Sequence, residues 1–514
     1  MNNPSPRKPV FPSISRKFQH LFLAEKDSAH IYWILAAITL IGMLMRLWKM
    51  NEPIAYDEAY TFIYFATRPL RQILADYSAP NNHILHTILV SLSYKILGGH
   101  IWIVRLPAFL AGTLSIPAGF FAARRIFNRN QSLAAASLVA LTPWFISYST
   151  NGRGYTLLTL LALLLMNFAG LLIQEQSRGA LIAYGITAAL GFYTIPIFLY
   201  PMAGISLWVL ASYLTDPDSW NKKSKRIWNL LASCALAGIL TVILYSPVIF
   251  FGTGVGSIIS NEMVEPRDWN TFTINMARRA PKTWSDWMSN IAPFAQYLLM
   301  GGFFLSLVFY KKASRQRLPL QLLMVIAIIG LLVLQRVAPF PRIWVFLEIF
   351  YMLFAAAGLV WLVETLMRNI GLSLSDARII PAIILLIVFF VFTNAYLSTR
   401  PLSIEAGKDF PEQHAAEYLT SHLNDGDVIF SIAPVDMQTA YYLYMNGLPY
   451  RVFYQKDHPT KVEHALIVLR KNTQYNTPER VLEFYKRTSD FNIQSSVLVY
   501  QYGPLNIFSI PSVQ

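Results

Sequence analysis

The sequence predicts an α-helical polytopic membrane protein with about 11 transmembrane helices and a small soluble α/β domain at its C-terminal end. Hydrophobic residues make up 54% of the 514 positions and charged residues only 14%, with a mean hydropathy of +0.41. The apolar residues gather in repeated stretches of about 18 to 25, the length that crosses a hydrocarbon core about 30 Å thick. A soluble globular chain does not have this pattern.

The apolar stretches define the predicted spans and their order. Basic residues in the first 29 positions are not followed by a cleavable signal segment, so residues 1–29 are expected to form a cytosolic tail. The spans are predicted at residues 30–50, 103–123, 132–149, 156–173, 180–197, 198–214, 227–250, 291–310, 318–334, 343–363 and 379–397.

The connectors between spans support this layout. With a cytosolic N-terminus every second connector should be basic, and the segments 124–129, 174–179, 222–226, 311–317 and 367–378 are basic or at least not acidic. The chain should therefore finish on the outer side.

Two outer loops are expected to carry helices of their own. Residues 82–97 form an apolar run that is short for a span, and counting it as one would invert the charge pattern that follows. We therefore expect an amphipathic helix on the outer face within a first outer loop of residues 51–102. The segment 251–290, which mixes glycines, acids and tryptophans, is predicted as a large outer loop.

The composition changes to that of a soluble α/β unit from residue 398. Residues 30–397 would thus form the transmembrane domain and 398–514 an extracytoplasmic domain. Helical spacing predicts helices at 411–423 and 438–446, and apolar runs predict strands at 427–430, 465–469 and 496–500.

Charge and cysteine content exclude two classes of function. The net charge is +14, but the Lys and Arg residues are spread over the connectors and form no single stripe, so no nucleic-acid partner is expected. Cys234 is the one cysteine and lies in an apolar run, which leaves no disulfide framework and no thiolate metal site.

The candidate site is a set of polar residues that the topology brings to one membrane face. Acids at a membrane boundary are costly unless they have a function, and Asp57 and Glu58 are adjacent just beyond the first span. With these acids come an imidazole and several guanidinium groups. Such a set suits attack on a phosphorylated substrate, because a carboxylate can take the acceptor proton while arginines stabilise the departing phosphate. The set comprises Asp57, Glu58, His83, Arg105, Arg153, Tyr155 and Arg342.

Four short motifs give the chain a family resemblance: YDEA at 56–59, NHILHTIL at 82–89, VRLP at 104–107 and SYSTNGRGY at 147–155. In this order and spacing they resemble the protein O-mannosyltransferase and aminoarabinose-transferase superfamily of GT-C glycosyltransferases, which use polyprenyl-phosphate sugars. The resemblance covers about the first 160 residues and later continues in the span layout and in Pro341-Arg342.

The resemblance implies a GT-C fold and a role for each site residue. A single hexose or pentose would move from a polyprenyl-phosphate donor to a glycan, lipid or protein acceptor, with inversion, on the outer face of a bacterial-type inner membrane. Asp57 would be the general base and Glu58 would pair with an arginine. Arg105, Arg153, Tyr155, Arg336 and Arg342 would hold the donor phosphate or position the loops, and Asn82, His83 and His86 would border the acceptor. No cofactor is required by the resemblance.

Simpler roles remain open for several of these residues. The two acids could cap a surface helix, Glu58 could form a purely structural ion pair, and Arg105, Arg336 and Arg342 could be membrane anchors. A divalent metal held by His83, His86 and Glu262 is a minority interpretation.

Three other functions also remain open. A polyprenyl-linked glycan flippase or transporter would be expected to place ionisable residues near mid-span and to show inverted repeats. An oligosaccharide ligase would transfer a whole glycan. The C-terminal domain could also be an independent partner-binding module.

Overall fold

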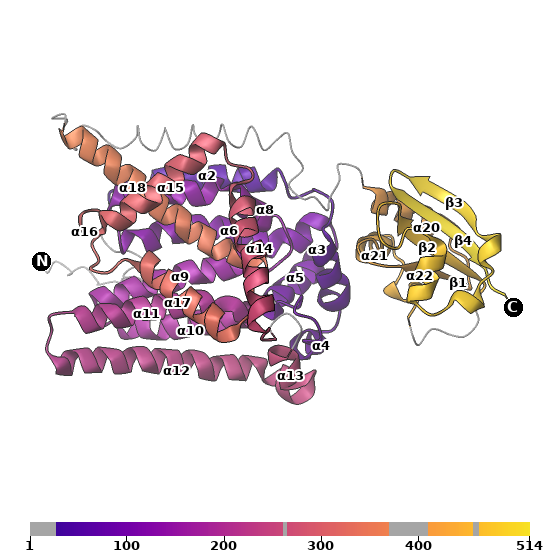
Figure 1. Ribbon diagram of the computed structural model, residues 1–514, viewed down its shortest axis with the longest axis horizontal. Coiled ribbons are helices and arrows are strands. Elements are labelled where there is room, and N and C mark those ends of the chain that lie inside the picture. The colour runs from indigo at the N-terminus through magenta and orange to yellow at the C-terminus, as the bar shows by residue number, and fades with distance from the viewer. Residues whose placement is uncertain (1–26, 261–264, 370–409, 456–461, 514) are drawn as a thin grey trace, which may run out of the picture.

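The computed structural model describes residues 27–260, 265–369, 410–455 and 462–513. These form a helical unit up to residue 369 and an α/β domain from residue 410, which lies against one end of the helical unit (Figure 1). The predicted span 379–397 and the predicted domain boundary at 398 lie outside the described residues.

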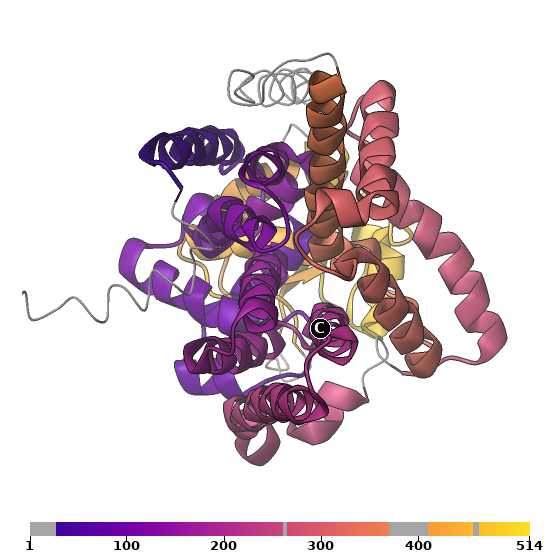
Figure 2. The same cartoon turned by 90° about the vertical axis from the view of Figure 1, so that its left-hand side faces the viewer.

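Most predicted spans coincide with a single helix. Together these helices make a bundle, which Figure 2 shows along its length, with the N-terminal helices in indigo and purple opposite the later ones in salmon and orange. The helices are α2 (Ala29–Leu47), α6 (Ile101–Arg124), α9 (Tyr155–Gln174), α10 (Arg178–Thr194), α11 (Leu199–Thr215), α12 (Trp220–Phe251), α15 (Pro293–Val308), α17 (Leu320–Gln335) and α18 (Val345–Asn369).

The predicted span at 132–149 is not one straight helix. It consists of α7 (Arg129–Leu141) and α8 (Pro143–Ser149), which meet at an angle of 59°. The break falls at Thr142, whose backbone is extended because the ring of Pro143 disfavours a helical conformation in the residue before it.

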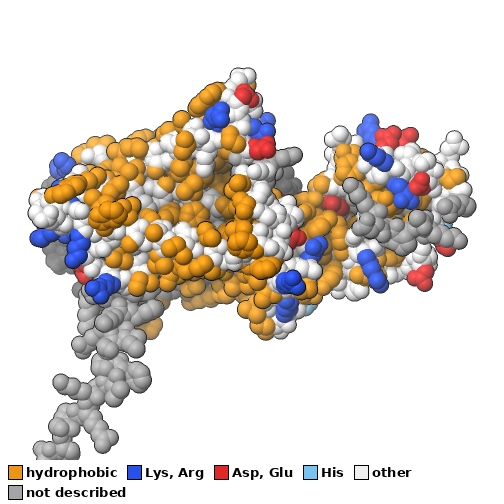
Figure 3. All heavy atoms as spheres, turned by 90° about the horizontal axis from the view of Figure 1, so that it is seen from below, with side chains coloured by type: hydrophobic (Ala, Val, Ile, Leu, Met, Phe, Trp, Pro, Cys, Tyr) orange, Lys and Arg blue, Asp and Glu red, His pale blue; other side chains and the backbone are white. Residues whose placement is uncertain are grey.

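Among the described residues, six helices are long and apolar enough to cross a membrane, or up to eight if each bent pair is one span. Helices α10 and α17 occupy predicted spans but have only 17 and 16 residues. Hydrophobic side chains cover the face of the helical unit seen in Figure 3. The chain is therefore an integral membrane protein.

The basic connectors meet at one end of the bundle. The Arg315 amide donates to the Ile126 carbonyl, and Arg317 pairs with Asp216. Asn128 donates to Glu364 near the end of α18. Alternate connectors thus share one end, as the charge pattern predicts.

The other end of the bundle carries short helices that lie outside the long ones. Before α6 come α3 (Tyr56–Thr61), the π-helix η1 (Phe62–Ala66), α4 (Leu70–Ala75) and α5 (Ile84–Leu97), so the predicted helix at 82–97 is present. The segment 251–290 contains α13 (Gly254–Ile259) and α14 (Trp269–Met288), and α14 runs across the direction of the bundle in Figure 1. Short turns complete the unit: η2 (Pro196–Phe198), α16 (Tyr310–Ala313) and η3 (Pro341–Trp344).

The C-terminal domain is a four-stranded mixed sheet with helices. Strands β1 (Asp427–Ser431) and β2 (His464–Arg470) are parallel, and the spatial order is β1-β2-β4-β3. Sequence analysis misses the central strand β4 (Leu505–Pro511), which pairs antiparallel with both β2 and β3 (Val497–Tyr502). The remaining elements are α20 (Pro411–His422), α21 (Asp436–Met445), η4 (Tyr450–Val452), α22 (Pro478–Phe484), η5 (Thr488–Asp490) and η6 (Ile493–Ser495).

One hydrophobic cluster runs across the junction of the two units. Phe62 of η1 packs edge-on against Tyr441 of α21, with ring centroids 5.4 Å apart, and Val90 and Val104 belong to the same cluster. The two units therefore share buried apolar surface, which stabilises their relative position.

Candidate active site

Asp57 lies in the first turn of α3, at the end of the bundle that faces the C-terminal domain. Its Oδ2 accepts a hydrogen bond from Nη1 of Arg342 at 2.9 Å, and its Oδ1 accepts one from Asn81 Nδ2 at 3.3 Å. The carboxylate is partly exposed and lines a cavity. Asp57 is therefore accessible to a ligand while two side chains fix its orientation.

Glu58 points the other way and is fully buried. Its carboxylate accepts two hydrogen bonds from Arg105, from Nη2 at 2.7 Å and from Nε at 2.9 Å, and it also accepts the Ala55 and Gly152 amides. The predicted pairing of Glu58 with an arginine is thus present. The contact with the Ala55 amide also makes Glu58 part of the N-terminal cap of α3. Capping of a surface helix is the structural role that the sequence leaves open for this acid.

Arg105 uses all five of its N–H groups within the protein. Besides Glu58, the guanidinium donates to the carbonyls of Met50, Glu52 and Pro53 at 2.8 to 3.1 Å. The side chain is only 3% exposed. With every donor satisfied, Arg105 holds the segment that leads into α3 and has no donor left for a substrate.

Arg153 crosses beneath the same helix. Its Nη1 donates to Thr61 Oγ1 at 2.7 Å and to the Asn81 carbonyl at 3.2 Å, and its Nη2 lies 3.4 Å from His83 Nε2. Nδ1 of His83 accepts the Gly154 amide at 3.0 Å. Burial and the charge of Arg153 hold the pKa of His83 well below its usual range, so this imidazole is neutral.

The cavity has a volume of about 500 Å³ and is walled by three parts of the chain. The first turn of α3 contributes Asp57, α8 and the loop after it contribute Tyr148 and Arg153, and α14 contributes Lys282 and Asp286, which form an ion pair. Arg342 of η3 also lines the cavity. The cavity therefore places the accessible carboxylate of Asp57 beside cations, which is the arrangement that phosphate chemistry needs.

Several predicted site residues do not line this cavity. Asn82 is fully buried and donates to the carbonyls of Ile73 and Asp76, so it fixes the turn after α4. His86 is also fully buried, and burial together with the Arg153 charge lowers its pKa to about 3. Arg336 ends α17 in a left-handed conformation and lies over the Trp269 ring. These positions give no direct contact with a ligand in the cavity.

The suggested metal set is not assembled among the described residues. No group of three or more His, Cys, Asp or Glu side chains that could hold a metal ion occurs in the described ranges. Glu262 lies outside them.

Sequence analysis missed several residues in the cavity wall and around it. Asn81 and Thr61 orient Asp57 and Arg153, but an isolated amide or hydroxyl carries no sequence signal of its own. Lys282 and Asp286 were overlooked although they are four residues apart on one helix face, a spacing that predicts an ion pair.

Comparisons with known proteins agree with this architecture. The family described as dolichyl-phosphate-mannose-protein mannosyltransferase matches residues 81–250. No curated protein matches the chain. The chain is similar to the crystal structure of ArnT from Cupriavidus metallidurans in the apo state, with a TM-score of 0.60 and 15% identity over 94% of this chain and 98% of that one.

Two further structures are similar. ArnT of Cupriavidus metallidurans bound to undecaprenyl phosphate matches with a TM-score of 0.56 and 14% identity, over 94% of this chain and 98% of that one. The apo oligosaccharyltransferase of Archaeoglobus fulgidus matches with a TM-score of 0.51 and 12% identity, over 89% of this chain and 71% of that one.

The fold and these matches define the class: the protein has the GT-C fold of polytopic membrane glycosyltransferases. Within that class, the predicted resemblance to the protein O-mannosyltransferase-like and ArnT-like enzymes is confirmed.

Proposed function

We propose that the protein is a membrane glycosyltransferase that moves one hexose or pentose from a polyprenyl-phosphate donor to an acceptor nucleophile, with Asp57 as the general base. The observation that carries this proposal is the contact of the Asp57 carboxylate with Arg342 inside the cavity. A base and a phosphate-binding cation 2.9 Å apart are what a direct displacement at a sugar phosphate requires.

The reaction follows from this geometry. Asp57 takes the proton of the acceptor hydroxyl as its oxygen attacks the anomeric carbon, and the bond from that carbon to the phosphate oxygen breaks. The lipid phosphate leaves with the bonding electrons, and Arg342 stabilises the added charge with a planar fork that matches phosphate oxygens. Attack opposite the leaving group inverts the anomeric centre.

The pair also suggests how the base becomes active. A phosphate bound by Arg342 would compete with Asp57 for the same guanidinium, and the carboxylate would then lose part of its ion pair. Donor binding would thus free a carboxylate oxygen of Asp57 for the acceptor hydroxyl.

A neighbouring groove fits the lipid part of such a donor. It lies between α14 and the η3 region, has a volume of about 200 Å³, and is lined by apolar side chains including Trp284, Trp287 and Trp344 with Arg279 among them. An apolar chain in this groove would bring its phosphate toward the arginines of the η3 region. ArnT with undecaprenyl phosphate supports a donor of this kind.

The location of the site supports an outward-facing enzyme. The basic connectors meet at the opposite end of the bundle from Asp57, and basic loops favour the cytosolic side. We therefore place the cavity and the C-terminal domain on the extracytoplasmic face of a bacterial-type inner membrane, where a glycan, lipid or protein acceptor would enter. A divalent metal is not needed for this scheme.

The direct test is the Asp57→Asn variant, purified in detergent and assayed with undecaprenyl-phosphate carrying labelled hexose or pentose. Loss of a general base lowers turnover about 10² to 10⁴-fold. The matched control is Asp218→Asn, the same change at the far end of the bundle, which should keep wild-type turnover.

Three outcomes would contradict the proposal. Full turnover by Asp57→Asn would remove the base assignment, and a product that carries a whole glycan by mass would favour a ligase. Movement of an intact lipid-linked sugar across the bilayer without cleavage would favour a flippase.

A further inference from the structure

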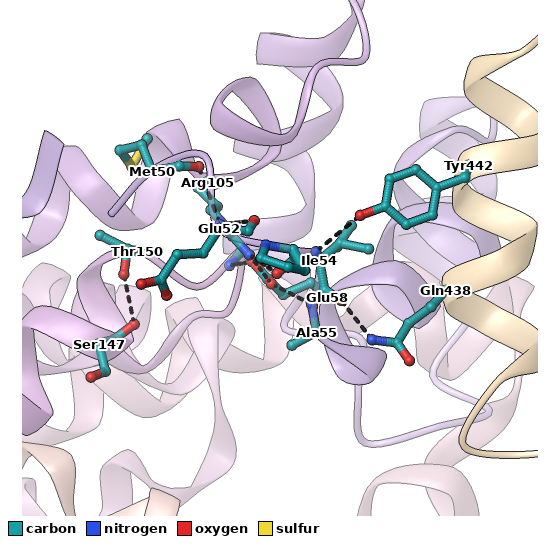
Figure 4. A network of polar contacts seen from close by, with 12 residues as sticks. Met50, Glu52, Ile54, Ala55, Glu58, Arg105, Ser147, Thr150, Gln438 and Tyr442 are labelled. Atoms are coloured by element: carbon teal, nitrogen blue, oxygen red, sulfur yellow. Dashed lines mark hydrogen bonds and ion pairs between the residues drawn. The ribbon is translucent and has the colours of Figure 1, made fainter. Parts of the chain in front are cut away.

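The segment that leads into α3 has few backbone partners: the Met50 and Glu52 amides donate to the end of α2 and the turn after it, and the Ala55 carbonyl accepts the first amides of α3. Residues 50–55 join α2 to α3 without forming a strand or helix, so their remaining polar groups need hydrogen-bond partners from elsewhere. Figure 4 shows that these partners are side chains that reach the segment from two opposite sides.

The first side is the transmembrane unit. Arg105 of α6 donates to the carbonyls of Met50, Glu52 and Pro53, and the Glu58 carboxylate accepts the Ala55 amide. Neither backbone polar group of the buried Ile54 takes part in these contacts.

The second side is the C-terminal domain. Gln438 of α21 donates from Nε2 to the Ile54 carbonyl at 2.7 Å, and the Ile54 amide donates to the Tyr442 hydroxyl at 3.5 Å. Gln438 and Tyr442 are four residues apart and therefore lie on one face of α21. Both polar groups of Ile54, which is 1% exposed, are thus satisfied by one helix of the other domain.

Further contacts keep α21 in this position. The Tyr441 hydroxyl donates to the Gly99 carbonyl at 2.7 Å, and the Tyr94 and Tyr444 hydroxyls lie 2.9 Å apart. Around them the rings of the junction cluster are buried. Helix α21 therefore hydrogen-bonds to three separate segments of the transmembrane unit. A flexible linker alone would not provide such contacts.

From this arrangement we infer that Gln438 and Tyr442 are positioning residues for catalysis: helix α21 fixes Ile54 and thereby sets the place of Asp57, three residues further along the chain. The inference rests on the proposed function of Asp57. Neither residue lines the cavity, and neither touches a substrate there. The C-terminal domain is then a structural part of the active site rather than an independent module.

The inference predicts separate effects on binding and on turnover. In Gln438→Ala the Ile54 carbonyl loses its partner, and a shift of about 1 Å in a catalytic group can cost about 10²-fold in rate. We expect kcat to fall about 10- to 100-fold. The affinity for undecaprenyl phosphate, measured by native mass spectrometry, should stay within about 2-fold, because Arg342 and the apolar groove are unchanged. Tyr442→Phe should have the same effect to a smaller degree.

Hydrogen exchange gives a readout that does not depend on sugar transfer. In the full chain in nanodiscs, amides of residues 50–58 should exchange at least about 10-fold faster in Gln438→Ala than in the wild type, because a local contact has been opened. The matched control is Gln413→Ala on α20, which removes a glutamine whose side chain donates to the exposed Glu417 and should change neither exchange nor kcat.

The outcomes separate this inference from the proposed function. Exchange and kcat in Gln438→Ala equal to those of Gln413→Ala would overturn it. A fall in kcat accompanied by equal loss of undecaprenyl phosphate binding and of the thermal unfolding midpoint would also overturn it, since that pattern indicates general destabilisation. If the wild type transfers no sugar, the proposed function fails and the exchange measurement alone decides whether α21 holds residues 50–58.

Discussion

Two neighbouring carboxylates receive opposite roles because consecutive helix residues point about 100° apart. Asp57 faces the cavity and Arg342, whereas Glu58 faces inward to Arg105, which has no donor to spare. The buried pair is a structural centre: Glu58 also accepts two backbone amides from different segments. Removing one charge would leave the other buried without compensation.

The Glu58→Gln variant tests this structural role. The amide keeps the shape of the side chain but leaves the Arg105 charge buried and unpaired, which costs about 3 to 5 kcal/mol. We expect a clear drop in the thermal unfolding midpoint in detergent. Glu52→Gln, in the same segment, removes an acid whose side chain is 39% exposed and paired with Lys49, so it should cost at most about 1 kcal/mol. Equal midpoints for the two variants would contradict the assignment.

The sequence predicts the convergence of Asp57, Arg105, Arg153 and Arg342, because span order alone brings them to one end of the bundle. It does not show which of them face the ligand. That depends on rotation of α3 and α6 and on the loop between α4 and α5, where Asn82 turned inward to satisfy the carbonyls of Ile73 and Asp76. The orientation of these side chains depends on hydrogen bonds between segments far apart in the chain. Such bonds leave no local pattern in the sequence.

Length and apolar content alone predict most of the long helices correctly. They do not predict breaks and short elements: Pro143 divides a predicted span, and strand β4 was missed although its neighbours β2 and β3 were expected. Strand β4 packs on both faces, with Leu505 and Ile507 in the junction cluster and Ile510 in a second apolar cluster, so its buried residues do not alternate strictly and give a weak signal.

The packing of α15 against α18 shows how close two helices of the bundle come. A Cβ added at Gly302 would lie 2.4 Å from the Ala355 carbonyl oxygen, and one at Gly358 would overlap the backbone of Gly302. Glycines at such a crossing let the two backbones touch. The neighbouring Gly301 meets nothing within 4 Å.

A pair of alanine substitutions therefore separates packing from helix propensity. Gly302→Ala should lower stability by about 1 to 3 kcal/mol, because the added methyl group must push α18 away. Gly301→Ala should be neutral or should stabilise by up to about 1 kcal/mol, since alanine favours helix. Thermal unfolding of both variants in the same detergent measures the difference. A stabilised Gly302→Ala would show that the helices can separate without cost.

At the scale of the whole molecule, the junction between the two units contains a partly buried acid. Asp436 begins α21, and burial is the largest cause that raises its pKa from 3.8 to about 6, although a hydrogen bond from Tyr56 opposes the shift. The ionisable groups around it are the phenols of Tyr56, Tyr60, Tyr450 and Tyr485. The pKa values of all four are raised, so none of them titrates near pH 6.

The junction should therefore weaken as pH rises. Because the folded pKa of Asp436 is above the unfolded value, its contribution is complete below about pH 4 and is lost between about pH 4 and 6, a difference of about 3 kcal/mol. Exchange of the amides in residues 50–58, compared at pH 4.5 and 7, should show this loss in the wild type. In Asp436→Asn this difference in exchange between pH 4.5 and 7 should disappear. If the difference is unchanged in the variant, another group causes it.

The contact between Gln438 and Ile54 joins residues 384 positions apart in the chain. During synthesis, the first helices enter the membrane long before α21 has been translated. A nascent or truncated chain therefore inserts with its catalytic loop unsupported, and competence for sugar transfer arrives only with the last fifth of the polypeptide.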